Sequence, residues 1–262
     1  MNFAYRAGEI NEYIINIRRH IHAHPELSFN ERKTTAYIAD KLEEMGVEVQ
    51  RFDDYTGCIG TIRGRNGGKT VLLRADIDAL PIQETGGAEY ASQTPGVMHA
   101  CGHDAHTACL LGAAKLLAER RTAFGGEVRF VFQPAEEVGQ GAKPFVEAGV
   151  LDGADRVFGL HSAPDLPVGT VGLKPGLNNA AVDLFRISVH GEPAHVAEPQ
   201  LGVDALYIAS QTVVALQALV TRLTSPVEPV IIGVGKLHAG TTYNALAGSA
   251  VLEGTTRTVS QE

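Results

Sequence analysis

Three short apolar runs, each followed closely by acidic or histidine residues, constrain the fold of this chain more than any other feature. Runs of this kind are typical of strands that are covered on both faces of a sheet. Helical patterns over residues 105–121 and 142–148 alternate with them, which predicts an α/β sheet with helices on both sides. The runs and the residues that follow them are Thr70–Ala75 with Asp76 and Asp78, Val128–Phe132 with Glu136 and Glu137, and Arg156–Leu160 with His161.

The polar residues after these strands are expected to converge, because ligands bind beyond the carboxyl ends of strands in open α/β sheets. Cys101 and His103 form a C-x-H pair just before one of the predicted helices. Thiolate, imidazole and carboxylate are the ligands of zinc and similar divalent ions. Taken singly, a C-x-H pair is more often incidental, paired glutamates are usually a solvated surface, and a histidine that ends a strand is usually structural. Their shared place at one end of one sheet favours a metal site.

The adjacent Glu136 and Glu137 suggest a division of labour, in which one binds metal and the other handles a proton. Asp78 either orients a metal ligand or is simply a turn carboxylate. A weaker alternative is a nucleophilic Cys101 with His103 as its base, but it leaves the paired glutamates without a role.

The remaining histidines have less specific interpretations. Those at positions 20, 22 and 24 lie at a predicted helix end, where a cation suits the helix dipole, and we expect a structural role. His99 and His106 flank the C-x-H pair and are candidate ligands by composition, although His106 falls on the following helix and is expected to pack. His195 lies in a loop of the second half, where solvent exposure is the default and function the alternative.

Two local signals make specific predictions near the start of the chain. Ser28 and Glu31 have the spacing of a capping box, which predicts that they open a helix over residues 31–45. The sequence Asn66-Gly67-Gly68 is typical of a hairpin turn between strands.

The pattern changes near residue 177, and we predict two domains, 1–177 and 178–262. Strand patterns over residues 182–189, 230–236 and 250–257 surround an amphipathic helix over 203–223. This β-α-β-β order indicates a ferredoxin-like α+β module that still lacks one helix and one strand.

Composition excludes several classes of partner. With 22 Lys and Arg against 30 Asp and Glu, the net charge is −8, so nucleic acid is not an expected partner. No apolar run approaches the roughly 18 residues of a membrane span, and the first residues show no signal-peptide pattern. Only three cysteines are present, which argues against a disulfide scaffold and favours a cytoplasmic location.

Over residues 20–258 the sequence resembles the metal-dependent amidohydrolases that include aminoacylase, hippurate hydrolase and the indole-acetyl-amino-acid hydrolases, and more distantly carboxypeptidase G. The motifs occur in family order: RADIDALPI, MHACGHDAHTA, FQPAEE, GLHSAP, GEPAHVAEPQLGVDAL and AGTTYNALAGSAVLEGTTRT.

The resemblance implies a three-layer α/β/α metallopeptidase-like catalytic domain with an incomplete ferredoxin-like lid. It implies two divalent metal ions (Zn, Mn, Co or Ni) and hydrolysis of the amide bond of N-acyl amino acids, releasing a carboxylate and a free amino acid. It also implies a homodimer formed through the lid. The alternatives are a metallo-aminopeptidase or dipeptidase on the same scaffold, or a truncated, non-catalytic remnant.

The resemblance also implies residue roles. Glu136 matches the general base, and Asp78 matches the aspartate that supports the dinuclear centre. His195 matches a lid histidine that reaches a partner subunit's active site and helps to polarise the scissile carbonyl. The lid positions Asn244 and Arg257 match substrate-binding residues, and the planar fork of Arg257 suits a carboxylate. The matches to metal ligands are Cys101, His103, Glu137 and His161.

The sequence departs from the family pattern in two places. The family has a further metal-ligand histidine in a C-terminal segment, whereas this sequence ends at Glu262, so we expect a truncated chain without this ligand. The string AGTTYNALAGSA also lacks the proline that usually follows the asparagine, which is a minor difference.

Overall fold

The computed structural model describes residues 3–260, and the chain separates into two compact units, Met1–Pro167 and Val168–Glu262. The domain boundary near residue 177 stays a prediction. Among the described residues, no helix has both the length and the apolar character needed to cross a membrane.

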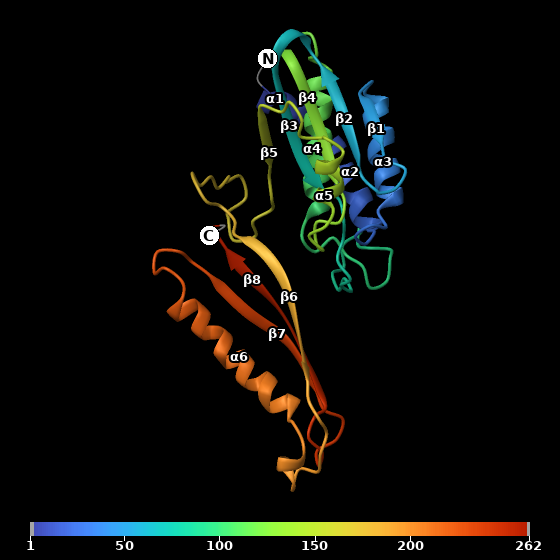
Figure 1. Cartoon of the computed structure of the whole chain (residues 1–262). Coiled ribbons are helices and arrows are strands. Elements are labelled where there is room, and N and C mark those ends of the chain that lie inside the picture. The colour runs from blue at the N-terminus through green and yellow to red at the C-terminus, as the bar shows by residue number, and fades with distance from the viewer. Residues whose placement is uncertain (1–2, 261–262) are drawn as a thin grey trace. The chain divides into compact units, whose positions relative to one another are not determined.

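Unit 1 is built on a five-stranded mixed sheet with the strand order β1-β2-β4-β3-β5 (Figure 1). Strands β4 and β5 run parallel to β3, whereas β1 and β2 form antiparallel pairs. The predicted α/β fold class is therefore confirmed. The strands are β1 (Glu48–Arg51), β2 (Cys58–Arg63), β3 (Arg65–Asp76), β4 (Gly125–Gln133) and β5 (Arg156–Gly159).

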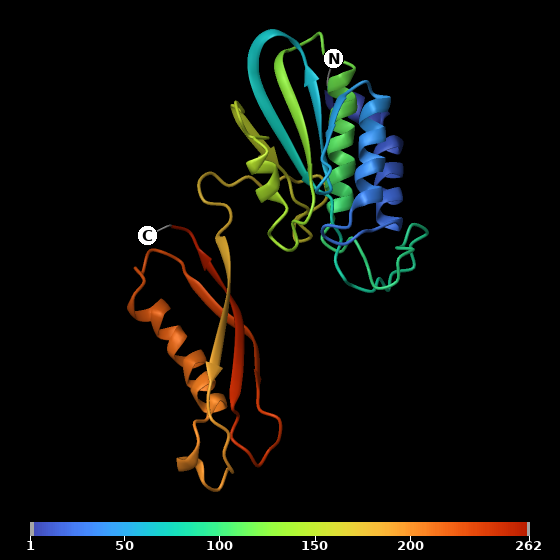
Figure 2. The same cartoon turned by 45° about the vertical axis from the view of Figure 1, so that its right-hand side comes forward.

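Helices cover both faces of this sheet, so the unit has three layers (Figure 2). On one face, Phe130 and Phe132 of β4 are fully buried and belong to the same core as Leu42 of α3 and Leu111 of α4. Side chains alternate along a strand, so Val131 faces the other way and packs in a second core that includes α5. The helices are α1 (Phe3–Glu9), α2 (Asn11–Ala23), α3 (Arg32–Glu44), α4 (His103–Ala118) and α5 (Ala142–Glu147).

The predicted hairpin turn at Asn66-Gly67-Gly68 is wrong. These residues lie inside β3, where the pairing with β4 shifts register between Arg65 and Thr70. A hairpin would pair β2 with β3, but β4 lies between the two strands. Local turn chemistry predicts a bend in the backbone, and the sheet order decides which strands are neighbours.

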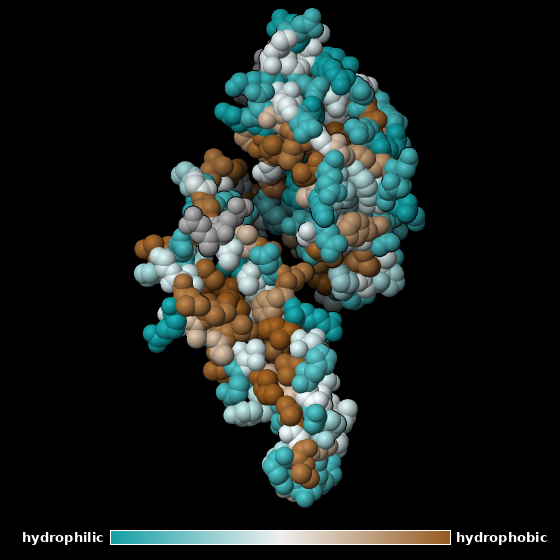
Figure 3. Space-filling view, viewed as in Figure 1, coloured by the Kyte–Doolittle hydropathy of each residue, from teal (hydrophilic) through white to brown (hydrophobic). Residues whose placement is uncertain are grey.

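Strand β5 forms one edge of the sheet and is exposed. All four of its residues are exposed, and Val157 and Phe158 keep 54% and 56% of their surface accessible. Figure 3 shows apolar side chains in brown at the surface where β5 runs. Within the described residues, this edge therefore has no covering layer.

Unit 2 is a three-stranded antiparallel sheet with the order β6-β8-β7 and one long helix against it (Figure 1). Ala205 and Ala209 of the helix pack with Leu252 of β8, so the helix lies on its own sheet. Ile208 and Leu219 of the same helix are 39% and 40% exposed. The elements are β6 (Ala181–His190), the short helix η1 (Pro199–Leu201), α6 (Ala205–Arg222), β7 (Ile231–Ala239) and β8 (Ser249–Thr258).

Candidate metal centre

Three parallel strands of unit 1 end at one edge of the sheet. Asp76 at the end of β3 pairs with Gln133 at the end of β4, and Arg74 pairs with Gly159 at the end of β5. The segments that follow these strands carry the carboxylates and the histidine singled out in the sequence. The parallel pairing thus brings three distant parts of unit 1 to one place.

His103, the first residue of α4, is the central side chain of this cluster and is fully buried. Its Nδ1 lies 2.9 Å from the backbone oxygen of Asp78. A carbonyl oxygen only accepts, so Nδ1 carries the hydrogen and Nε2 of the neutral ring presents its lone pair. Nε2 lies 3.6 Å from Asp76, 3.7 Å from Glu137 and 3.9 Å from Glu136.

His161 is oriented in the same way, by a carbonyl at Nδ1. This atom donates to the backbone oxygen of Ser162 at 2.8 Å, so the lone pair is on Nε2. Nε2 in turn lies 3.3 Å from the sulfur of Cys101. Orientation of an imidazole by a hydrogen bond at its other nitrogen is the usual arrangement of metal-binding histidines.

Asp78 joins three parts of the cluster. Its Oδ2 accepts hydrogen bonds from the Ser28 hydroxyl at 2.7 Å and from the Glu137 backbone N–H at 3.0 Å, and Oδ1 lies 3.3 Å from Nδ1 of His103. Burial by itself would raise the pKa of Asp78, but the nearby His103 ring and the hydrogen bonds from Glu137 and Ser28 hold that pKa below its ordinary value. Of the two interpretations of Asp78, these contacts favour the orienting role.

The predicted capping box at Ser28 and Glu31 is wrong. Glu31 is the N-cap residue of α3, but its side chain caps no helical N–H. Ser28 hydrogen-bonds Asp78 instead, and a backbone N–H in the first turn, that of Thr34, donates to Glu26. Both residues of the predicted box therefore serve contacts outside the helix.

His106 is buried, as expected, and both its nitrogens have partners. Nε2 accepts a hydrogen bond from the Ser162 backbone N–H at 2.8 Å, so Nδ1 carries the hydrogen that it donates to Asp76 at 2.6 Å. Burial would raise the pKa of Asp76, but His106, Arg74 and His103 lower it to about 2. His106 is thus not available as a ligand, although donor atoms of Asp76, His103 and His106 lie within 4.8 Å of one another.

The cluster fits a divalent metal. Donor atoms of Cys101, His103 and His161 lie within 4.8 Å of one another, and so do those of His103, Glu136 and Glu137. Nε2 of His103 and Oε1 of Glu137, which lie 3.7 Å apart, are buried without a hydrogen-bond partner among the described residues. Unpaired buried polar atoms cost free energy, and a cation between them offsets that cost. Thiolate, imidazole and carboxylate donors suit zinc and its neighbours in the first transition row.

The electrostatics disfavour Cys101 as a nucleophile. Burial, together with the nearby carboxylates of Glu137 and Glu136, raises the pKa of its thiol to about 12. A nucleophilic cysteine needs the opposite shift, from positive charge nearby.

A second group of polar side chains lies behind the cluster. His22 is buried, with Nδ1 2.9 Å from Asp104 and Nε2 3.2 Å from Glu84, and Arg18 also contacts Asp104 at 3.1 Å. These contacts tie α2 to α4 and to the loop after β3, in keeping with the expected structural role. His99 is buried, and burial lowers its pKa to about 4. Neither ring nitrogen of His99 has a partner among the described residues, and it belongs to none of the metal-type groups found there.

In unit 2, His195 and Asn244 lie side by side. His195 forms an isolated bridge with Ala245, and the backbone N–H of Val196 donates to the oxygen of Asn244 at 3.1 Å. Arg257 is near the other end of β8, eight residues or about 26 Å from Ser249, which pairs with the end of β6 that leads to His195. Unit 2 therefore brings together two of its three predicted residues.

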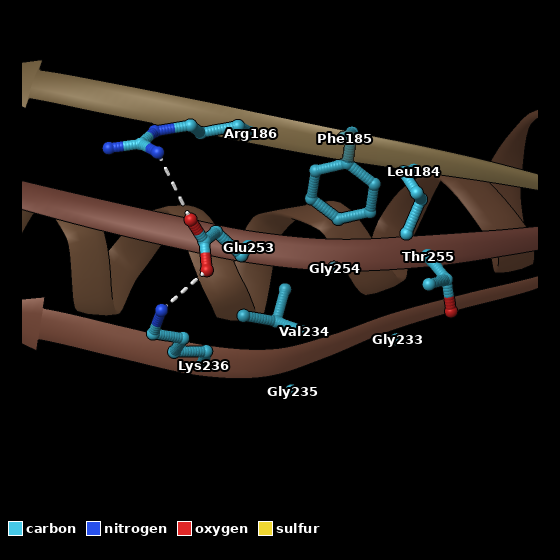
Figure 4. A pocket seen from close by; sticks show the side chains of 10 residues that line it. All are labelled: Leu184, Phe185, Arg186, Gly233, Val234, Gly235, Lys236, Glu253, Gly254 and Thr255. Carbon is cyan, nitrogen blue, oxygen red and sulfur yellow. Dashed lines mark ion pairs between the residues drawn. The ribbon is translucent and has the colours of Figure 1, made fainter. Parts of the chain in front are cut away.

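Unit 2 also has an open hollow of about 620 Å³ on its sheet, which contains none of the predicted site residues. Figure 4 shows Leu184 and Thr255 along it, and Glu253 paired with both Arg186 and Lys236. The three charged side chains at one end are paired with one another, and the rest of the lining is mainly apolar or glycine. The hollow offers no cluster of metal-binding or nucleophilic groups.

Comparison with known proteins identifies the class to which this fold and this donor set belong. Residues 72–241 match peptidase family M20/M25/M40, and the chain is a member of that family. It is 49% identical over 253 residues to an N-acetyl-L-cysteine deacetylase of Bacillus subtilis, covering 97% of this chain and 61% of that protein. It is 45% identical over 252 residues to an N-acyl-L-amino acid amidohydrolase of Geobacillus stearothermophilus, covering 95% of this chain and 68% of the relative.

The fold agrees with that assignment. The crystal structure of the Bacillus subtilis YXEP protein, described as a dinuclear metal binding peptidase from the M20 family, superposes with a TM-score of 0.80 at 42% identity. The match covers 97% of this chain and 66% of that one. The chain thus spans roughly two thirds of the length of the relatives that it matches.

Proposed function

We propose that this chain carries the catalytic metal centre of an amidohydrolase that cleaves N-acyl amino acids into a carboxylate and a free amino acid. The observation that carries the proposal is the buried Nε2 of His103, which has no hydrogen-bond partner among the described residues and belongs to donor groups with both the Cys101–His161 pair and the Glu136–Glu137 pair. The relatives named for N-acetylcysteine and N-acyl amino acids support this class of substrate.

In this proposal Cys101, His103, Glu137 and His161 are ligands of two divalent ions, Zn, Mn, Co or Ni. Such ions, when bound, polarise an amide carbonyl and make a water molecule more acidic. Support for two ions comes from the two donor groups that share His103 and from the dinuclear relative. Asp78 contacts both the ring of His103 and the backbone N–H of Glu137, and so fixes their positions relative to each other.

Glu136 is the proposed general base. Its side chain is 39% exposed, against 19% for Glu137, so it is the more accessible of the two to water and substrate. It takes the proton from the attacking water and delivers it to the departing nitrogen. Glu137, more buried and with an unpaired oxygen, is the better placed to bind metal.

Unit 2 is the proposed lid. Asn244 and Arg257 are the proposed substrate-binding residues, and Arg257 pairs with the carboxylate of the substrate. His195 is proposed to polarise the scissile carbonyl in the active site of a partner subunit. We propose a homodimer through this unit, whose edge strands β6 and β7 each pair on one side only. Sedimentation that shows a strict monomer at high concentration would remove His195 from this role. A cytoplasmic location suits the proposal, because Cys101 must stay reduced to bind metal.

A peptidase on the same scaffold is the second candidate, favoured by the relative described as a dinuclear peptidase. N-acetylated amino acids and dipeptides with a free amino terminus separate the two activities. Faster hydrolysis of the dipeptides would assign the chain to the peptidases.

Two cysteine variants test the metal centre directly. We expect Cys101→Ser to lose most bound metal and activity, because serine is a poor ligand for these ions. Cys109→Ser, on α4 but outside every donor group, is the matched control and should keep both. Metal content of the purified proteins, measured by mass spectrometry, decides the question. Full metal occupancy in Cys101→Ser would contradict the assignment.

A further inference from the structure

Glu31 is a fully buried carboxylate with no assigned role. It is 0% exposed, and no lysine, arginine or histidine of residues 3–260 forms an ion pair with it. Its Oε2 accepts a hydrogen bond from the Thr56 hydroxyl at 2.6 Å, and its Oε1 accepts one from the Ala135 backbone N–H at 2.8 Å. Burying a carboxylate is costly, so both contacts matter.

Ala135 has an unusual backbone conformation. Its φ is +50°, in the left-handed region that residues with a Cβ rarely adopt. Its oxygen accepts hydrogen bonds from the N–H groups of Gln140 and Gly141, which close a compact turn over residues 135–141. That turn carries Glu136 and Glu137, so the conformation of Ala135 sets the direction in which the two glutamates leave β4.

Two carboxylates accept hydrogen bonds from backbone N–H groups of this turn. Glu31 holds the N–H of Ala135, and Asp78 holds the N–H of Glu137 at 3.0 Å, one on each side of Glu136. Glu31 reaches the turn from the start of α3, 104 residues away in sequence. An anchor at each end of a three-residue stretch leaves little freedom for the peptide groups between them.

We infer that Glu31 is a positioning residue for the metal centre. By fixing Ala135 in its left-handed conformation, it aims the carboxylate of Glu137 at Nε2 of His103, which lies 3.7 Å away, and keeps Glu136 beside it. The inference rests on the proposed function, because it presumes that Glu137 binds metal. It predicts that loss of the acceptor at Glu31 weakens metal binding itself, beyond any loss of stability.

Three variants of Glu31 separate its hydrogen-bond acceptor from its charge and its length. Glu31→Met keeps the approximate size and removes the acceptor, and Glu31→Asp keeps the charge but draws it back by one methylene. Glu31→Gln keeps an oxygen for Ala135, while the Thr56 hydroxyl can rotate to accept from the new amide. Groups that orient a ligand typically change metal affinity by about 10–100-fold when removed. We expect Glu31→Met to lose metal affinity by about this factor. Glu31→Asp should also lose metal affinity, and Glu31→Gln should bind metal nearly as well as the wild type.

Glu26→Met is the matched control. The Glu26 carboxylate accepts hydrogen bonds from the N–H and the hydroxyl of Thr34, in the first turn of α3. Its removal should destabilise the same helix without freeing the turn at Ala135. We therefore expect a lower Tm with unchanged metal affinity.

The experiment is a Co²⁺ titration of each purified protein at a temperature well below its Tm, with hydrogen exchange of the Ala135 amide as a second measurement. The expected result is weaker Co²⁺ binding and faster exchange in Glu31→Met, with both restored in Glu31→Gln. Wild-type affinity in Glu31→Met, or in Glu31→Asp if the Met variant does not fold, overturns the inference. A loss of Co²⁺ affinity in Glu26→Met or Glu31→Gln as large as that in Glu31→Met also overturns the inference. If the wild-type chain itself binds no Co²⁺, it is the proposed function that fails.

Discussion

The side chain of His106 supports the backbone of Ser162, the residue next to the proposed ligand His161. The Ser162 N–H donates to Nε2 of His106 at 2.8 Å, and the opposite nitrogen donates to the buried Asp76 at 2.6 Å. A histidine in this motif could be mistaken for a ligand, but here both its nitrogens are occupied and it supports the neighbour of a proposed one.

Replacing His106 should therefore affect metal binding from a distance. We expect His106→Ala to weaken it by about 10–100-fold, because His161 loses its backbone support. It should also lower the free energy of unfolding by about 1–3 kcal/mol, because Asp76 and the Ser162 N–H lose a partner. Metal titration and denaturant unfolding measure the two effects. His20→Ala, which removes a ring stacked on Tyr37, is the control and should leave metal affinity unchanged.

The adjacent glutamates should respond differently to the same substitution. Glu136→Gln is nearly isosteric and should keep the metal, but the amide cannot accept a proton, so turnover should fall by about 10²–10⁴-fold. Glu137→Gln should lower metal occupancy, because a charged ligand is lost. Metal content and turnover of both variants are the measurements. The reverse pattern would mean that the two roles are exchanged, and normal metal content with normal turnover in both would refute the assignment.

Gly141 has no room for a side chain. A Cβ at this position would lie 1.6 Å from the backbone oxygen of Pro134, so the turn that carries Glu136 and Glu137 would have to shift. We expect Gly141→Ala to cost about 1–3 kcal/mol of stability and to weaken metal binding. Gly139→Asn is the control, because Gly139 faces open space and asparagine tolerates its φ of +66°. Equal thermal stability and metal affinity in the two variants would contradict the prediction.

Cys58 should make the stability of unit 1 fall at alkaline pH. Burial raises the pKa of its thiol from 9.0 to about 12, so the folded state keeps a proton that the unfolded state releases. The stabilisation is complete below pH 9 and is lost as the pH rises from 9 toward 12, at a rate of up to about 1.4 kcal/mol per pH unit. Relative to Cys58→Ala, the wild-type free energy of unfolding should decline over this range. Parallel pH profiles for the two proteins would show that the thiol makes no contribution.

Local patterns in the sequence predicted much of the framework. The three apolar runs coincide with the parts of β3, β4 and β5 that lead to the cluster. These predictions succeed because side-chain periodicity and apolar content depend on a few neighbouring residues. The composition of the metal cluster could be predicted for the same reason, since each of its motifs is contiguous in the chain.

Only the tertiary structure decided what the supporting residues do. Ser28 and Glu31 have the spacing of a helix cap, yet they bind Asp78 and Ala135, which lie 50 and 104 residues away. Asn66-Gly67-Gly68 has the chemistry of a hairpin, yet β4 lies between the strands it would join. In both cases the partner comes from a segment that is distant in the sequence. A local pattern states what a side chain is able to bind, and the packing of the sheet determines which partner it meets.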